Sequence, residues 1–153
     1  MNYLRKMNQT EFNKYSLLSF NTFLIETAKS SGQALDLIKA KFGNPPSEIT
    51  DRDLWFVIQY DTKDIGFLWL KLSPDKTEAF GFDICLEENY RNRGIGHLVL
   101  SEAGELLKLM NINKIKICAF ESNLSARQLY SKFNFKEVTF NQDRKQFTLE
   151  LNL

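Results

Sequence analysis

The sequence predicts a single α+β domain in which helices cover both faces of a mixed, mostly antiparallel sheet of about six to seven strands. Three observations lead to this prediction: two amphipathic helical segments come first, three consecutive strand-like runs follow, and a helix, a strand, a helix and a hairpin complete the chain. With 153 residues, of which 43% are hydrophobic, the chain can bury one sizeable core. We therefore expect one domain over residues 1–153.

The N-terminal quarter is expected to form two helices. Apolar residues recur at roughly helical spacing from Glu11 to about Ala28, with Thr10 as the expected N-cap. A second, shorter helix follows and ends at residues 43–46, where glycine and two prolines stop it. The residues expected on the buried faces are Phe12, Tyr15, Leu18, Phe23 and Leu24 in the first helix and Ala34, Leu37, Ile38 and Phe42 in the second.

The middle of the chain changes to strand-forming residues. Runs rich in aromatic and branched side chains over 54–60, 65–72 and 77–86 are separated by short polar turns. Three such runs in a row suggest an antiparallel meander.

The second half predicts a crossover followed by a hairpin. Beyond Gly94 the apolar positions follow the stripe of an amphipathic helix, and residues 115–119 alternate as a strand. This strand–helix–strand crossover should be right-handed and should place strands 77–86 and 115–119 parallel or nearly so. A helix over 124–133 and a hairpin of strands 135–140 and 145–151 finish the prediction. The helical stripe after Gly94 comprises Val99, Ala103, Leu106, Leu107 and Met110.

Composition narrows the function classes. A formal net charge of +1 supplies no general field for nucleic acid or an acidic membrane, so neither is an expected partner. Cys85 and Cys118 lie in apolar runs without metal-ligand spacing, which predicts reduced core thiols and no metal. The sequence shows neither a signal-peptide pattern nor an apolar run of membrane-spanning length, so we expect a cytoplasmic protein, as a monomer or homodimer.

The chemistry is concentrated where a strand ends and a helix begins, over residues 86–97. Helix starts expose unpaired N–H groups and a positive dipole end, which suits phosphate esters. Gly94 and Gly96 remove Cβ atoms that would keep phosphate away from these amides, while Arg91 and Arg93 add positive charge. A dinucleotide-binding turn is excluded, because it needs a third glycine where this chain has Val99. A solvated helix start with two exposed arginines is the alternative interpretation.

Two motifs resemble one known family. Residues 91–96, Arg-Asn-Arg-Gly-Ile-Gly, match the Arg/Gln-x-x-Gly-x-Gly/Ala signature with which GNAT N-acetyltransferases bind acetyl-CoA. Residues 123–135 match the Asn-x-x-Ala-x-x-Leu-Tyr-x-x-x-Gly-Phe run of the same family, except that Asn134 replaces glycine. Asparagine is the next best residue for a left-handed helix end, so we expect the turn to be kept. The chain is most similar to small bacterial GNAT proteins of unassigned substrate.

This resemblance implies a GNAT fold and acetyl-CoA as cosubstrate. It implies that strand 77–86 splays from its parallel neighbour, that pantetheine fills the gap, and that the backbone near Leu86 polarises the thioester carbonyl. Asn123 would bind pantetheine, cap the last helix, or do both. The implied coenzyme-binding residues are Leu86, Arg91, Asn92, Arg93, Gly94, Ile95, Gly96, His97 and Asn123.

The candidate catalytic residues are Tyr130 and Asp83. The resemblance implies that the Tyr130 phenol protonates the leaving thiolate, whereas the pattern alone also fits a core tyrosine. Asp83 interrupts an apolar strand and is the candidate general base or, equally, a structural acceptor. Some relatives carry a glutamate where this chain has Cys118, which we expect to be packed.

The predicted function is transfer of an acetyl group from acetyl-CoA to a primary amine, on a small molecule or on a peptide or protein. A GNAT-fold module that binds acyl-CoA without turnover is one alternative, and an interaction domain with a fortuitous phosphate loop is another. The acceptor should be recognised by the N-terminal helices and the final hairpin. Glu26 and Asp36 of the helices are acidic candidates for contact with a cationic amine or, equally, solvated surface charges.

Overall fold

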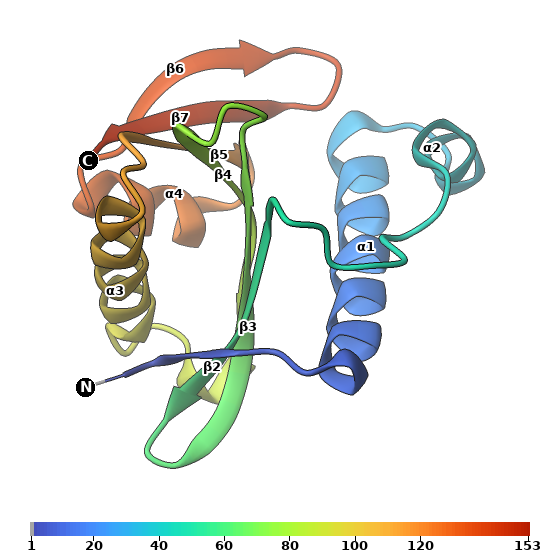
Figure 1. Ribbon diagram of the computed structural model, residues 1–153. Helices are drawn as coiled ribbons and strands as arrows, with labels where there is room; N and C mark the ends of the chain where they lie inside the picture. The colour runs from blue at the N-terminus through green and yellow to red at the C-terminus, as the bar shows by residue number, and fades with distance from the viewer. Residues whose placement is uncertain (1) are drawn as a thin grey trace.

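A computed structural model of the protein describes residues 2–153, which form one open sheet with helices on both faces (Figure 1). The helices and strands follow one another in the predicted order, with one additional strand at the N-terminus. In chain order the elements are β1 (Leu4–Lys6), α1 (Gln9–Ser31), α2 (Leu35–Phe42), β2 (Asp53–Tyr60), β3 (Lys63–Leu72), β4 (Glu78–Leu86), the 3₁₀ turn η1 (Glu88–Tyr90), α3 (Ile95–Leu109), β5 (Lys114–Phe120), α4 (Leu124–Lys132), β6 (Lys136–Asn141) and β7 (Gln146–Asn152).

The sheet has seven strands in the order β1-β2-β3-β4-β5-β7-β6. Within residues 2–153 the pair β4–β5 is parallel and the other neighbouring pairs are antiparallel. The crossover through α3 produces the parallel pair, because a returning helix brings the chain back to the same end of the sheet. The predicted mixed, mostly antiparallel sheet is confirmed.

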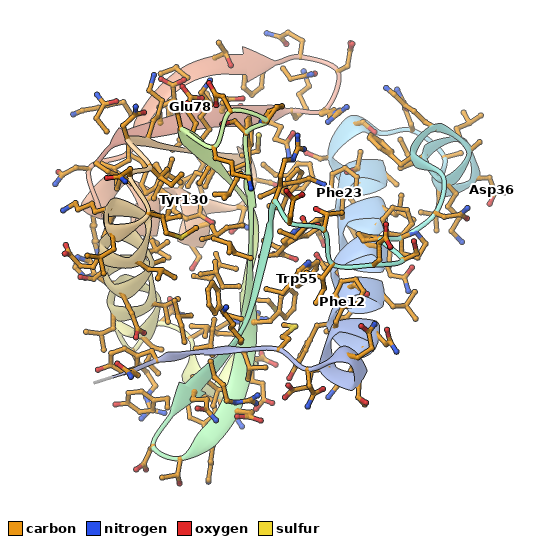
Figure 2. The ribbon with its side chains drawn as sticks, viewed as in Figure 1. Phe12, Phe23, Asp36, Trp55, Glu78 and Tyr130 are labelled. Carbon is orange, nitrogen blue, oxygen red and sulfur yellow. The ribbon has the colours of Figure 1, made fainter. Side chains whose placement is uncertain are left out.

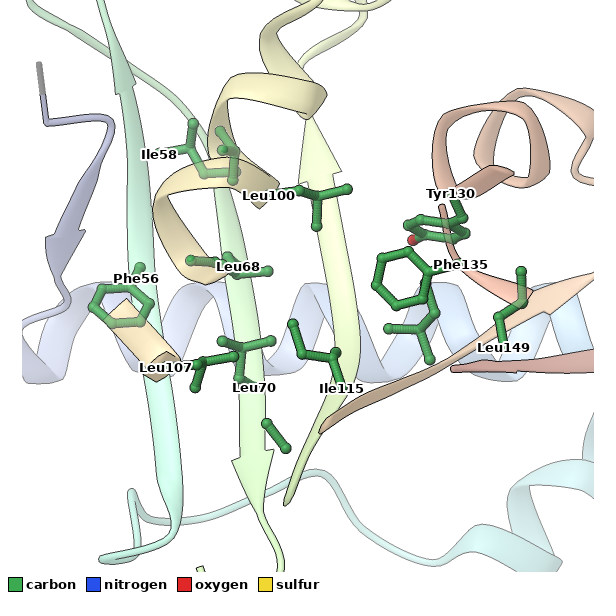
Figure 3. Packing of buried hydrophobic residues seen from close by; sticks show 14 of the residues in the cluster. Phe56, Ile58, Leu68, Leu70, Leu100, Leu107, Ile115, Tyr130, Phe135 and Leu149 are labelled. Atoms are coloured by element: carbon green, nitrogen blue, oxygen red, sulfur yellow. The ribbon is translucent and has the colours of Figure 1, made fainter. Parts of the chain in front are cut away.

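The larger core lies between the sheet and the helices α3 and α4 (Figure 3). The predicted α3 stripe is confirmed at its centre, where Val99, Ala103 and Leu107 are buried, but Met110 is exposed. The strands contribute alternate residues, such as Leu68 and Leu70 of β3 with Leu149 of β7. This face therefore holds most of the buried apolar surface.

The opposite face is covered by α1 and carries a smaller aromatic core of Phe12, Trp55 and Phe67 (Figures 1 and 2). The apolar stripe predicted for the two N-terminal helices is wrong in part, because Leu18 and Leu37 are exposed. Small hydroxyl residues occupy much of the buried side of α1 instead and let the helix approach the sheet. These buried hydroxyl residues are Ser16, Ser19 and Thr27.

The first helix begins two residues earlier than predicted. Asn8 is the N-cap, and its side chain accepts a hydrogen bond from the Glu11 amide while Glu11 bonds back to the Asn8 amide. Thr10, the predicted cap, lies inside the first turn.

The sequence analysis missed the short strand β1, which pairs with β2. The Glu102 carboxylate of α3 accepts a hydrogen bond from the Leu4 amide of this strand. Three residues are too few for a periodic pattern to reveal.

The β3–β4 ladder allows a sharp test at Gly66. A Cβ built there would lie 2.0 Å from the Cys85 carbonyl oxygen. We expect Gly66→Ala to lower the free energy of unfolding by about 1–3 kcal/mol, because backbone atoms must move to accommodate it. Urea denaturation measures this change.

Gly104 of α3 is the matched control. A Cβ there would make an ordinary contact, with Leu153 Cδ2 at 3.8 Å. Gly104→Ala should therefore raise the free energy of unfolding by about 0.5–1 kcal/mol through helix propensity. Equal effects of the two substitutions would contradict the assigned strand register.

Candidate active site

A bulge in β4 and the early end of its parallel pairing open the centre of the sheet. Trp69 of β3 pairs with Asp83, but the next residue, Leu70, pairs with Gly81, so Phe82 is an extra residue in β4. On its other side β4 pairs with β5 only as far as Gly81. From residue 82 to 86 β4 therefore has a strand partner on β3 alone, and the predicted splay is present.

Side chains from both faces of the sheet converge on this opening. Asp83 of β4 accepts a hydrogen bond from Ser19 Oγ of α1 at 2.7 Å, which places its carboxylate on the α1 face. Tyr130 comes from α4 on the other face, where its ring packs on Phe135 (Figure 3). Asp83 and Cys118 both act electrostatically on Tyr130, so the three groups share one neighbourhood.

The Tyr130 side chain is buried, with 7% of its surface exposed. Burial raises the pKa of Tyr130, and the nearby Asp83 and Cys118 raise it further. The phenol is therefore protonated at neutral pH and has a hydroxyl hydrogen available for donation.

Asp83 is a carboxylate with few polar neighbours. Burial raises its pKa to about 6, while the hydrogen bonds from Ser19 and the Ile84 amide limit the rise. Both sequence interpretations of Asp83 are compatible with this geometry, since it has a structural hydrogen bond and also a pKa close to neutrality. Sequence analysis did not single out Ser19, because nothing within α1 indicates which hydroxyl meets a strand residue 64 positions away.

The prediction that both cysteines are core thiols is wrong for Cys118. Cys85 is partly buried, but Cys118 is exposed, with its Sγ 3.7 Å from Thr148 Oγ1 of β7. The alternation of β5 explains the difference: Ile117 and Ala119 face the larger core, so Cys118 points to the opposite face.

The start of α3 has the backbone form expected of an anion site. Asn92 and Gly94 have positive φ values of 57° and 80°, and Gly94 is the N-cap in the left-handed conformation. No side chain caps this helix, in contrast to α1 and α4, which Asn8 and Asn123 cap. Its first-turn amides and dipole therefore remain available to a negative group.

The two arginines of this loop also shape it. Arg91 Nε donates to the Leu86 carbonyl at 2.8 Å and so ties the loop to the end of β4. The Arg93 guanidinium lies over the rings of Tyr90 and Tyr60, at 5.4 and 5.9 Å from their centroids. Neither arginine is merely solvated, although both remain exposed at the helix start.

Gly96 serves helix packing. A Cβ at Gly96 would lie 3.0 Å from Leu129 Cδ2 of α4, so the missing side chain lets the two helices lie close together. His97 likewise meets the edge of Phe133, with ring centroids 4.9 Å apart. Gly96 therefore has a packing role between α3 and α4, and the expected approach of a phosphate to its amide stays a prediction.

The second motif positions α4. Asn123 Oδ1 accepts a hydrogen bond from the Ala126 amide at 3.2 Å, which confirms the capping interpretation of this residue. At the other end Asn134 has a φ of 72°, so it takes the left-handed turn expected of it in place of glycine. Both ends of the helix that carries Tyr130 are therefore fixed by local interactions.

A pocket of about 360 Å³ lies on the α1 face between the C-terminal part of α1 and the chain around β5 and the β6–β7 turn. Glu26 lines it, as does Glu121, to which the sequence analysis gave no role. Asp36, the other acidic candidate, points outward from α2 (Figure 2). The remaining lining residues are Lys29, Ser30, Ser122 and Lys145.

None of the helices within residues 2–153 combines the length and apolarity needed to cross a bilayer. No three histidine, cysteine or acidic side chains in that range group closely enough to hold a metal ion.

Comparison with known proteins identifies the family. The sequence profile of the acetyltransferase (GNAT) family matches residues 19–135. The uncharacterized N-acetyltransferase YycN of Bacillus subtilis is 29% identical over 100 residues, which span 64% of each protein and thus less than two thirds of YycN. The YycN crystal structure has a TM-score of 0.78 at 25% identity and covers 90% of this chain and 94% of its own.

A more distant structure shares the same fold. The PaiA N-acetyltransferase of Thermoplasma acidophilum, solved in complex with coenzyme A, has a TM-score of 0.69 at 19% identity over the full length of both chains. The fold with its splayed strands is that of an acetyltransferase, and the family profile matches more than half of the chain. This chain belongs to the acetyltransferase (GNAT) family, which confirms the predicted resemblance and fold.

The buried carboxylate makes a testable contribution to stability. Because the folded-state pKa of Asp83, about 6, lies above its ordinary value of 3.8, the folded protein holds a proton that the unfolded chain releases within this window. Stability attributable to Asp83 should fall as pH rises through the window and stay lower above it. Asp83→Asn should remove this fall and raise the free energy of unfolding at neutral pH by about 1–3 kcal/mol. Urea denaturation across a pH series measures it.

Asp75 provides a control, because its pKa is shifted in the direction opposite to that of Asp83. Hydrogen bonds from Ser73 and Thr77 hold the pKa of Asp75 below its usual value. Asp75→Asn should therefore lower stability at neutral pH and have little effect once the carboxylate is protonated in acid. An Asp83→Asn protein that is less stable than wild type at neutral pH would show that the carboxylate is not penalised by burial.

Proposed function

We propose that this protein is an acetyl-CoA-dependent N-acetyltransferase that transfers acetyl directly to a primary amine. The observation that supports this most strongly is the opening between β4 and β5, where Tyr130 and Asp83 approach from opposite faces of the sheet. A linear cofactor arm entering from the α3 side and an amine entering from the α1 side would meet there. The acceptor amine belongs to a small molecule, a peptide or a protein.

The coenzyme would lie along the splayed strands. Its diphosphate is held by the uncapped first turn of α3, over residues 93–97, with the charge of Arg91 and Arg93 beside it. Its pantetheine arm pairs with the edge of β4 between residues 82 and 86, which lacks a strand partner on the β5 side. Asn123 would add a contact to this arm while it caps α4.

The proposed reaction is a direct acyl transfer from the thioester to the amine. The amine nitrogen attacks the thioester carbonyl carbon, a C–N bond forms, and the C–S bond breaks to release the thiolate. Asp83 accepts the proton that the attacking nitrogen loses, since a pKa of about 6 leaves it ionised at neutral pH. Tyr130 donates its hydroxyl proton to the sulfur, since its raised pKa keeps the phenol protonated at neutral pH. The coenzyme supplies the acetyl group, and these side chains position and move the protons.

Binding of the coenzyme is the first test. Acetyl-CoA should raise the melting temperature, because a ligand bound only by the folded state stabilises it. Arg91→Gln should weaken binding by about 10-fold, since it removes a charge at the helix start and the tie to Leu86. Titration calorimetry measures the affinity.

Lys76→Gln is the control for Arg91→Gln. It removes one positive charge at the turn between β3 and β4, away from the start of α3. Its affinity for acetyl-CoA should equal that of wild type. An unchanged melting temperature of the wild type at saturating acetyl-CoA would refute the proposed function.

Tyr130→Phe separates an enzyme from a module that only binds acyl-CoA. The ring and its packing on Phe135 are kept, so the fold and coenzyme affinity should persist. Loss of the donated proton should slow the chemical step by about 10²- to 10⁴-fold with little change in KM. Single-turnover rates over a pH series measure the chemical step without interference from product release.

Tyr15→Phe is the matched control, because it removes a phenol hydroxyl from a tyrosine of α1 that packs on Phe67. Its single-turnover rate should stay within about 2-fold of wild type, well below the general-acid effect. Coincident rates for wild type and Tyr130→Phe would assign Tyr130 to packing alone.

A further inference from the structure

A continuous row of aromatic rings crosses the α1 face of the sheet and ends beside Asp83. It starts under α1 with Phe12, whose ring meets Trp55 at 5.3 Å between centroids, and continues to Trp69 at 4.4 Å. Trp69 stacks on Phe82 at 4.6 Å, and Phe82 meets Phe80 at 6.1 Å. These spacings lie in the range of favourable aromatic pairs.

The row passes from buried to exposed along its length. Phe12 and Trp55 are 1% and 4% exposed and belong to the smaller core. Phe82 and Phe80 are 53% and 38% exposed, although each is large and apolar. Core packing explains the first two rings, whereas the last two keep a large part of their surface exposed.

The bulge in β4 decides where this exposed end lies. Phe82 is the extra residue opposite the Trp69–Leu70 step, so its ring stacks on Trp69 while Asp83, the next residue, pairs with the same Trp69. Both side chains therefore share the α1 face, on which Asp83 bonds Ser19. An apolar aromatic surface thus adjoins the proposed proton acceptor.

The surface beyond this end is charged. Lys116 of β5, the register partner of Phe80, pairs with Glu78 at 3.3 Å and with Glu150 at 3.6 Å. These neighbouring charges are satisfied by one another, so they offer no unpaired partner to a charged acceptor. The rings of Phe80 and Phe82 are the distinctive recognition surface next to Asp83.

We infer that the acceptor is an arylalkylamine, a primary amine carried one or two carbons from an aromatic ring. This rests on the proposed function and specifies its substrate class. The acceptor ring stacks on Phe82 and the edge of Trp69, and the short alkyl chain sets the nitrogen beside the Asp83 carboxylate. Apolar contacts of this kind discriminate between acceptors by about 10- to 200-fold.

The chain offers a direct optical readout of this surface. It has two tryptophans, and both Trp55 and Trp69 belong to the aromatic row. We expect 2-phenylethylamine, added to protein saturated with CoA, to change tryptophan fluorescence saturably. Ethanolamine should bind at least about 10-fold more weakly.

Three variants test the role of the ring. Phe82→Ser should weaken 2-phenylethylamine binding by about 10-fold or more, and Phe82→Leu, which keeps an apolar side chain, should fall in between. Leu109→Ser is the control, because Leu109 is 83% exposed on α3 across the sheet. It should bind 2-phenylethylamine as tightly as wild type. Equal affinity of wild type and both Phe82 variants would overturn the inference.

Turnover distinguishes this inference from the function on which it rests. In a thiol-release assay the ratio of kcat/KM for 2-phenylethylamine over ethanolamine should exceed about 10 and collapse toward one in Phe82→Ser. Acetyl-CoA binding with a ratio near one in wild type would reject the substrate class and leave the acetyltransferase assignment in place. Absence of acetyl-CoA binding would reject the acetyltransferase itself.

Discussion

The premature end of the parallel pairing between β4 and β5 is the constraint on which the rest of this structure depends. Parallel strands joined through a helix would normally pair along their length, but the ladder stops at Gly81 and an extra residue, Phe82, follows at once. The sheet consequently opens at its centre instead of at an edge. Asp83, Tyr130 and Cys118 come together because the opening lets side chains from opposite faces act on one another.

The two faces of the sheet differ in packing and in the site proposed for each. The α3–α4 face holds the larger core and fixes the start of α3, where one glycine supplies a left-handed cap and the other brings the two helices close. The α1 face has a smaller core of aromatic rings, with hydroxyl side chains on the buried side of α1, and a pocket near Glu26. A rigid layer thus supports the proposed coenzyme site, while the less filled layer is available to an acceptor.

Loop residues that look purely functional in the sequence also hold the loop together. Arg91 bonds the end of β4, and Arg93 lies over Tyr90 and Tyr60. These contacts preorganise the loop for anion binding, because a loop that is already folded around its own arginines loses less entropy when an anion binds. The apolar stripe predicted for α1 was wrong in part because Leu18 was expected to be buried by its apolarity. Close contact between the helix and the sheet instead favours the small Ser16 and Ser19.

The sequence by itself determined the order of the helices and strands from α1 to β7, the crossover that makes one pair parallel, the glycine-bearing start of α3 and the Asn123 cap with the Asn134 turn. These features depend on interactions within a few residues or on a repeating hydrophobic period, which a linear pattern records. Tertiary structure alone decided that Ser19 meets Asp83, that Cys118 is exposed and that Phe82 bulges beside Trp69. Such contacts join residues far apart in the chain, and their geometry follows from how two strands twist away from each other, which no local period encodes.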